Sequence, residues 1–386
     1  MFQFDDIIGQ DDVKKSLISQ VHSGKLHHAH LFLGKMGFGT FQLSMAFIKY
    51  VYCQDKQDHD SCNICSNCLK INKLAHIDIH FTLPSFKKEA LSKALMPEFR
   101  NLVNETQARF DLKDWHDHNN EKNAKIRSAE CDVILHDMGL SSYEDGYKTQ
   151  IIWMAESLEK ESNKILKILE EPNPQTLFIL IAESSEDLLP TILSRCNIHK
   201  ILPLKSETVR NFLAQEGGSI SDEMLTRAVH FSEGDILEAK RYLADEDSAF
   251  PLEVNLLNFL RGLIHFHERK FDNINKAILQ AELLASQSRP NQKKFLDYFQ
   301  YFLRQLVLIK ITQTCQLNET LLKAAYHFAN ILDIDQIEVW SQLVDKYHYA
   351  IEGNANVKIS FVSLAIESGK IQEREEFKIL ISSKDI

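Results

Sequence analysis

The chain has 386 residues, of which 44% are hydrophobic and 25% charged, proportions that exclude a disordered protein and predict two or three globular domains. It carries 44 basic and 54 acidic residues, and this net charge of −10 argues against a broad nucleic-acid-binding surface of its own. The N-terminal sequence MFQFDDIIGQ lacks a basic stretch followed by an apolar segment, and no run approaches the roughly 18 apolar residues of a membrane span. We therefore expect a cytoplasmic protein.

The first 80 residues are expected to alternate between helix and strand. Apolar residues recur every four positions from Val13 to Val21, which predicts an amphipathic helix. The sequence HAHLFLG at 28–34 predicts a strand that ends in a glycine-rich turn, and residues 40–52 predict a second helix. A strand, a glycine loop and a helix in this order are typical of a parallel α/β domain that binds ligands at the loop.

Four further apolar runs predict the other strands of this sheet. They are HIDIHFTLP at 76–84, YKTQIIWMA at 147–155, QTLFILIA at 175–182 and IHKILPL at 198–204. The charged, glycine-free segment at about 87–124 interrupts the series, and we expect it to form a helical insertion outside the sheet.

The remaining chain changes character twice. Short helical patterns separated by Gly217-Gly218 and Gly234 predict a small helical lid at 206–246. Residues 251–386 contain only three glycines, which predicts a separate all-helical domain. The predicted fold class is therefore α/β plus all-α, with a parallel-sheet domain at 1–205, the lid and a C-terminal helical domain.

Four cysteines, Cys53, Cys62, Cys65 and Cys68, have the spacing of a structural zinc site. Four thiolates complete a tetrahedral shell and leave no open position for water, so this module at 53–68 is predicted to be structural rather than catalytic. Free buried thiols are the alternative. His59 is a possible substitute ligand, although a solvated loop histidine is the more ordinary interpretation.

The segment LFLGKMGFGTFQLS at 31–44 has the outline of a phosphate-binding loop without its reactive side chains. Gly34, Gly37 and Gly39 are present, but Thr40 occupies the position of the lysine that reaches the phosphates. Phe41 occupies the position of the hydroxyl that binds Mg²⁺. We therefore expect a degenerate loop that does not hydrolyse ATP.

A second catalytic element is also missing. The strand that contains QIIWMAES would end in carboxylates in an active ATPase, but it has Trp153 and Met154 there. Gly234-Asp235 is followed by Ile236 and Leu237, and no arginine that could contact a phosphate follows nearby. Weak nucleotide binding by the loop backbone remains open.

These elements occur in an order that resembles the delta-prime subunits of bacterial DNA polymerase III clamp loaders, a degenerate branch of the AAA+ family. The matching segments are FDDIIGQ at 4–10, HAHLF at 28–32, the glycine loop, the four-cysteine module, HID at 76–78, NKILKILEEP at 163–172 and LLPTILSRC at 188–196. The match runs from residue 4 to about 245, and the helical C-terminal third agrees with the collar domain of that family. The insertion at 87–124 departs from the family pattern, and its role is left open.

The resemblance implies a stator subunit in a hetero-oligomeric ring that uses ATP to open a sliding clamp and place it on primed DNA. No intrinsic activity is expected beyond membership of a DNA-directed DNA polymerase holoenzyme. The implied partners are the gamma or tau ATPase and the delta subunit, with the clamp and DNA reached through the complex and no membrane contact. Structural Zn²⁺ is the expected cofactor, and ATP is not expected in the chain's own site.

The resemblance also implies a role for Arg195, the arginine of the SRC motif. It would project into the ATP site of the neighbouring subunit, where a guanidinium can stabilise charge on the transferring phosphoryl group. By side-chain chemistry alone, a surface or salt-bridged arginine is the more ordinary interpretation. Glu170 and Glu171 end a helix, and because adjacent helical residues do not face one point, a helix-end structural role is expected for both.

Two alternatives from other functional classes remain. The first is an active AAA+ motor subunit that uses an unorthodox loop, which would bind ATP and hydrolyse it with magnesium. The second is a zinc-dependent nucleic-acid-binding module, against which the acidic net charge counts.

Overall fold

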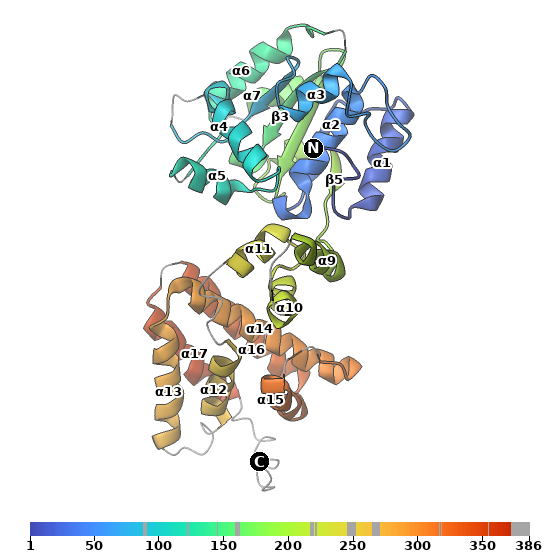
Figure 1. Cartoon of the computed structure of the whole chain (residues 1–386). Helices are drawn as coiled ribbons and strands as arrows, with labels where there is room; N and C mark the ends of the chain where they lie inside the picture. The colour runs from blue at the N-terminus through green and yellow to red at the C-terminus, as the bar shows by residue number, and fades with distance from the viewer. Residues whose placement is uncertain are drawn as a thin grey trace. The chain divides into compact units, whose positions relative to one another are not determined.

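The structure is a computed structural model of the chain, drawn in Figure 1. It describes residues 1–87, 91–121, 123–144, 146–158, 163–216, 220, 222–244, 252–264, 271–315, 317, 319–353 and 355–371. The chain divides into two compact units, Met1–Asp245 and Glu246–Ile386.

The first unit is built on a five-stranded sheet in the order β2-β3-β4-β1-β5. Every neighbouring pair is parallel, and each predicted strand is found. The strands are β1 Ala29–Leu33, β2 Ile79–Thr82, β3 Lys148–Trp153, β4 Thr176–Ala182 and β5 Asn197–Lys200. These findings confirm the predicted parallel α/β class.

Helices cover both faces of this sheet, and the central strands β3 and β4 are therefore buried along their whole length. Alternate residues face different cores: Ile151 and Trp153 pack on one face, and Ile152 on the other. The helices of the sheet domain are α1 Asp11–His22, α2 Thr40–Tyr52, α3 Ser66–Asn72, α6 Ser128–Gly139, α7 Asn163–Glu170 and α8 Pro190–Leu193. Two short 3-10 helices, η1 Met36–Phe38 and η2 Ala155–Ser157, follow β1 and β3.

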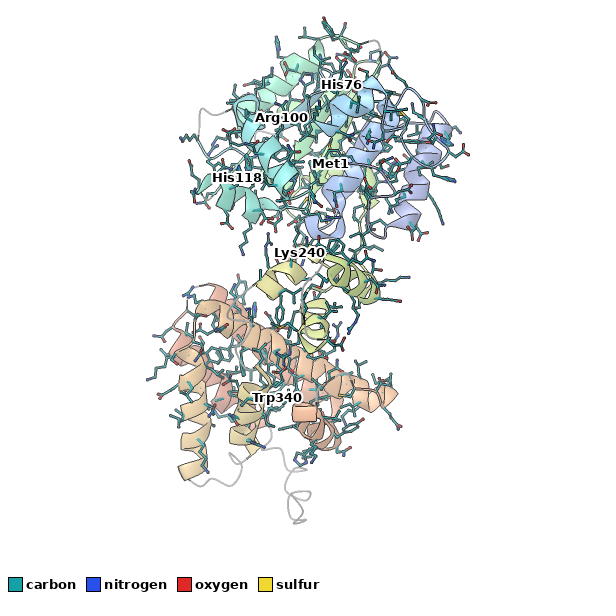
Figure 2. The ribbon with its side chains drawn as sticks, in the orientation of Figure 1. Met1, His76, Arg100, His118, Lys240 and Trp340 are labelled. Carbon is teal, nitrogen blue, oxygen red and sulfur yellow. The ribbon has the colours of Figure 1, made fainter. Side chains whose placement is uncertain are left out.

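The segment at 87–124 folds into two helices, α4 Ser92–Glu105 and α5 Leu112–Asn119. Arg100 and His118 mark these helices in Figure 2. Asp111 starts α5 with a capping box, in which its side chain accepts the N–H of Asp114 and the Asp114 side chain accepts the N–H of Asp111. Residues 88–90 and 122 lie outside the described part of this segment.

Three helices of the first unit follow the sheet: α9 Ser206–Glu216, α10 Asp222–Phe231 and α11 Ile236–Ala244. They pack around a small apolar core of their own that includes Val209, Leu213 and Ala228. We refer to these three helices as the lid. Gly217 and Gly218, which were predicted to separate lid helices, lie outside the described residues.

All the secondary-structure elements in the described residues of the second unit are helices. Its helices are α12 Leu252–Ile264, α13 Phe271–Ala285, α14 Arg289–Thr312, α15 Glu319–Ile331, α16 Ile334–Glu352 and α17 Val357–Ile371. Buried aromatic rings, among them Phe259, Phe299 and Trp340, form its core. No helix in the described part of the chain combines the length and apolar character needed to cross a membrane.

Candidate functional site

The glycine loop lies between β1 and α2 and closes on itself. The hydroxyl of Thr40, at the position of the missing lysine, lies 3.0 Å from the carbonyl oxygen of Gly34 and 2.8 Å from that of Lys35, and can donate to either. The backbone N–H groups of Phe38 and Gly39 donate to carbonyls of the same turn, each at 3.0 Å. A phosphate-binding loop directs such N–H groups at its ligand. Here the N–H groups of Phe38 and Gly39 and the hydroxyl of Thr40 make hydrogen bonds within the turn.

Two glycines of the loop have structural reasons to be glycine. Gly39 has a φ of 92°, in the left-handed region that disfavours other residues. A Cβ at Gly37 would lie 1.7 Å from Oδ1 of Asp235, the residue that precedes lid helix α11. The turn and the close approach of this acidic side chain therefore explain both glycines without a bound phosphate.

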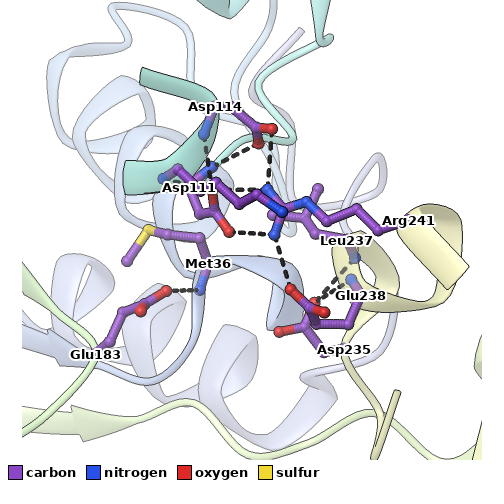
Figure 3. Close-up of polar contacts among 9 residues, drawn as sticks. Met36, Asp111, Asp114, Glu183, Asp235, Leu237, Glu238 and Arg241 are labelled. Atoms are coloured by element: carbon purple, nitrogen blue, oxygen red, sulfur yellow. Dashed lines mark hydrogen bonds and ion pairs between the residues drawn. The ribbon is translucent and has the colours of Figure 1, made fainter. Parts of the chain in front are cut away.

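Two carboxylates lie against the loop (Figure 3). The Oε1 atom of Glu183, which follows β4, accepts the N–H of Met36 at 2.9 Å. The Oδ1 atom of Asp235 accepts the N–H groups of Leu237 and Glu238 at 2.9 and 3.1 Å and so caps α11. Burial raises the pKa of both carboxyl groups. A raised pKa marks surroundings that disfavour the ionised carboxylate.

An aromatic cluster fills the region next to the loop where Mg²⁺ chemistry would require polar groups. Phe41 is 1% exposed, and its ring centroid lies 5.9 Å from that of Phe99 and 5.0 Å from that of Phe110. Trp153, at the end of β3, lies 5.3 Å from both of these rings and 6.3 Å from Trp115. Phe99, Phe110 and Trp115 all come from the segment 87–124, so this insertion supplies most of the cluster.

Little space remains between the loop and the lid. The cavity there has a volume of about 10 Å³ and is lined by residues 36–39 of the loop and by Ile236 and Leu237 of the lid, among others. Such a volume admits no more than a single water molecule. This cavity is therefore too small to hold a nucleotide.

The lid and the insertion are joined through Arg241 of α11 (Figure 3). Its guanidinium makes a two-pronged contact with Asp111, at 2.6 and 2.7 Å, and a further contact with Asp114 at 2.9 Å. It also contacts Glu238 of its own helix at 2.8 Å. Burial alone would raise the pKa of Asp111, but the hydrogen bonds and charge of Arg241 bring that pKa below its ordinary value. This ion cluster ties two segments that the chain separates by 130 residues.

The four cysteines of the predicted metal site are brought together. Cys53 follows the last residue of α2, Cys65 precedes α3 and Cys68 lies within it. One sulfur from each of the four lies within 4.8 Å of the other three. A tetrahedral zinc site with Zn–S bonds of about 2.3 Å places its sulfurs about 3.8 Å apart, so the donor set fits structural zinc. Cys131, Cys196 and Cys315 lie outside this group.

The cysteine module also holds the N-terminal segment. The backbone N–H of Asp5 donates to Asp60 at 3.1 Å, and the side chain of Gln3 donates to the carbonyl of Ser61 at 3.3 Å. Between and beside these contacts, Phe2 and Phe4 are buried in the core of the sheet domain. The module therefore supports packing of the domain and lies outside the loop region.

Arg195 lies in the turn between α8 and β5, at one edge of the sheet. Its side chain is 28% exposed and pairs with Glu170 at the end of α7. It borders an open hollow of about 660 Å³, distinct from the glycine loop. Burial raises the pKa of the adjacent Cys196 to about 12, so this thiol is not a nucleophile at neutral pH.

Arg241 and Glu183 were not among the predicted site residues. Arg241 follows Asp235 by more than one helical turn, and its partners lie in the insertion, so no local pattern connects them. The sequence DLKD at 111–114 has the spacing of a capping box, and this local pattern could have identified Asp111 and Asp114 as the start of a helix. It gives no indication of their partner Arg241.

Comparisons with known proteins agree with the sequence resemblance. A family model described as "DNA polymerase III, delta subunit" matches residues 9–205. The chain is 26% identical over 208 residues to DNA polymerase III subunit delta' of Bacillus subtilis, covering 54% of this chain and 52% of that protein. It is 25% identical over 223 residues to the Escherichia coli protein of the same name, covering 57% and 55%. The chain thus spans about half the length of the curated relatives it matches.

Solved structures of lower similarity were also found. A DNA polymerase III gamma subunit-related protein from Thermotoga maritima aligns with a TM-score of 0.36 and 14% identity, covering 94% of this chain and 100% of that chain. The RuvB Holliday junction branch migration motor of the same organism aligns with a TM-score of 0.36 and 15% identity, covering 85% and 86%. TM-scores of this size do not by themselves define a shared fold. The family model covers just over half of the chain, including the loop, the four cysteines and Arg195, and the chain therefore belongs to the family described as DNA polymerase III, delta subunit.

Proposed function

We propose that this chain is the delta-prime-type stator of a DNA polymerase III clamp loader, which does not hydrolyse ATP and supplies Arg195 to the ATP site of a neighbouring subunit. The observation that carries the proposal is the closed loop: Thr40 is turned onto the loop's own carbonyls, and the cavity beside it is no larger than one water molecule. The names of the relatives, subunits delta' and tau of DNA polymerase III, support the part of the proposal that makes this chain a clamp-loader subunit of that polymerase.

In this proposal the sheet domain spans 1–205, the lid 206–246 and a collar domain 251–386 that mediates assembly. The four cysteines bind one structural Zn²⁺, which would hold the end of α2, the start of α3 and the N-terminal segment together. The partners are the gamma or tau ATPase and the delta subunit of a cytoplasmic hetero-oligomer. The clamp and primed DNA are reached through that complex.

The contrast between the glycine loop and the surroundings of Arg195 supports a role for Arg195 in the site of another chain. The loop has lost the groups that bind phosphate, whereas Arg195 is partly exposed beside an open hollow. A guanidinium in such a position can enter a site formed by another chain and stabilise charge on a transferring phosphoryl group. The chain would therefore complete a site that belongs to its neighbour.

The test is to reconstitute the complex with Arg195→Ala and measure DNA-stimulated ATP turnover. We expect assembly on gel filtration to be unchanged and turnover at the adjacent site to fall about tenfold or more, since trans-acting arginines contribute on the order of 10³–10⁵ in related phosphoryl transfers. Arg210→Ala, an exposed lid arginine, is the matched control. Unchanged turnover in Arg195→Ala contradicts the assignment.

The isolated chain provides the test against an active motor subunit. We expect no magnesium-dependent ATP turnover and no micromolar ATP binding by titration calorimetry. Micromolar binding with turnover would replace the stator proposal with the motor alternative.

A further inference from the structure

The guanidinium of Arg195 is already engaged within the chain. Its Nη2 donates to Oε1 of Glu170, and its Nη1 donates to the carbonyl of Thr191 at 2.7 Å and to Oγ of Ser194 at 3.2 Å. Its Nε is buried without a hydrogen-bond partner among the described residues. One internal carboxylate therefore neutralises the arginine, and one of its donor atoms is still unused.

The hollow beside Arg195 is lined mainly by polar side chains, and the guanidinium of Arg195 is paired there with one carboxylate. Among the residues that the structure describes, the lining of the hollow consists of His27, His28, Leu169, Glu170, Ser194, Arg195, Cys196 and Asn197, and Glu170 is the only acidic side chain in this set. His28 lies 2.7 Å from the carbonyl of Leu169 through its Nε2, which fixes the end of α7 where Glu170 is located. The volume of about 660 Å³ is sufficient for the phosphates of a nucleotide.

Building on the proposed function, we propose that Glu170 is an internal competitor for Arg195, occupying the guanidinium until phosphate groups of the neighbour's nucleotide displace it. In the free subunit the carboxylate holds the arginine against α7. When the neighbouring subunit docks with ATP bound, the phosphate oxygens take over the Nη2 donor and the carboxylate turns to solvent. The arginine is thereby available only when a stronger anion is present.

The exposure of the pair makes this exchange feasible. The Glu170 side chain is 48% exposed and that of Arg195 28%, and ion pairs in contact with water are weak because solvent competes for both charges. A γ-phosphate carries more negative charge than a carboxylate and offers three oxygens to the guanidinium. The internal pair is therefore strong enough to position the arginine and weak enough to be replaced.

The experiment measures the affinity of the reconstituted complex for a fluorescent, non-hydrolysable ATP analogue with magnesium. Glu170→Gln removes the competing charge and keeps the side-chain shape, and we expect binding at the adjacent site to tighten two- to fivefold, which is about 0.4–1 kcal/mol at 1.4 kcal/mol per tenfold. Glu171→Gln is the matched control, because it makes the same charge change at the next, exposed residue. We expect it to bind like the unmodified complex.

A double-mutant cycle shows whether Glu170 acts through the arginine. In an Arg195→Ala background, Glu170→Gln should have no effect, because there is no guanidinium left to release. Three results would overturn the proposal. Glu170→Gln could have the same affinity for the ATP analogue as Glu171→Gln, or a weaker affinity than the unmodified complex. The third is that Glu170→Gln still tightens binding of the analogue in the Arg195→Ala background. If Arg195→Ala lowers ATP turnover while Glu170→Gln has the same affinity for the analogue as Glu171→Gln, the competitor role of Glu170 is refuted and the proposed function stands. If Arg195→Ala changes nothing, the proposed function fails as well.

Discussion

Removal of Arg241 tests whether the insertion and the lid are held together as the structure indicates. Arg241→Ala deletes the contacts to Asp111 at 2.6 and 2.7 Å and to Asp114 at 2.9 Å. These side chains are 23%, 18% and 29% exposed, so the cluster is mostly shielded from water. Its loss leaves two neighbouring carboxylates without their counter-ion.

The loss of stability expected for Arg241→Ala follows from the intermediate burial of these side chains. Removing one partner of a fully buried ion pair destabilises a protein by roughly 3–5 kcal/mol, and breaking an exposed pair by about 0–1 kcal/mol. For Arg241→Ala we expect a loss of about 2 kcal/mol, between these limits. Arg241→Lys keeps the charge but not the two-pronged geometry, and we expect about half of that loss. The control Arg210→Ala removes a contact with Asp222, which is 87% exposed, and should change stability by less than about 0.5 kcal/mol.

The assay is urea unfolding followed by tryptophan fluorescence in a Trp340→Phe background. The chain has three tryptophans, of which Trp115 and Trp153 lie in the first unit and Trp340 in the second. Replacing Trp340 therefore confines the signal to the unit that contains Arg241, which avoids treating two units as one transition. Trp115 lies in α5 beside Asp114 and reports directly on the insertion.

The reasoning is refuted if Arg241→Ala is no more destabilising than Arg210→Ala. The pH dependence gives a second check. Because the pKa of Asp111 is lower in the folded state, its contribution is present above its unfolded pKa, about 3.9, and is lost as pH falls through the folded value. The difference between the unmodified chain and Arg241→Ala should therefore shrink below about pH 4.

Three further outcomes are expected. Chelation of the metal, or Cys65→Ser, should lower the unfolding midpoint of the first unit, because the module holds the N-terminal segment; an unchanged midpoint contradicts a structural metal. Thr40→Lys should not create ATP binding in calorimetry, since the cavity stays closed, and micromolar affinity would show that the loop opens readily. Burial lowers the pKa of His30 to about 3 and of His199 to about 4, so stability should fall as pH drops below 6.5. In urea unfolding we expect the free energy of unfolding to fall by about 1 kcal/mol per histidine between pH 7 and 5.5, and to fall less in His199→Phe. An equal fall in the unmodified chain and in His199→Phe would contradict the assignment of this pH dependence to the buried histidines.

The elements of the sheet domain were predictable because their signals are local. Apolar runs bounded by turns mark the five strands, and the glycines mark the exit from β1. The four cysteines lie close together in the sequence, so their spacing was likewise sufficient to predict that their sulfurs converge. Glu170 is the last residue of α7 and pairs with Arg195, whereas Glu171 lies just beyond the helix, so the expected helix-end role of both residues stays a prediction.

The contacts that close the glycine loop were not predictable in this way. The position of Asp235 against Gly37 depends on where the lid lies. The pairing of Arg241 with Asp111 depends on the fold of the segment 87–124, which is distant from Arg241 in the sequence. The sequence pattern indicates that Phe41 and Trp153 replace catalytic groups, but it does not predict that they belong to one aromatic cluster. Pairings between distant segments are set by tertiary packing, for which a single sequence carries no periodic signal.

The aromatic cluster has an evolutionary consequence. A lysine placed at position 40 would leave in place the close approach of Asp235 to Gly37, the rings around Phe41 and the lid contacts of Arg241. Each of these contacts now contributes to folding, so removing any one of them destabilises the domain before a nucleotide can compensate. Reversion would need several simultaneous changes through less stable intermediates. Under the proposed function, the segment 87–124 therefore makes an active nucleotide site difficult to restore by single substitutions.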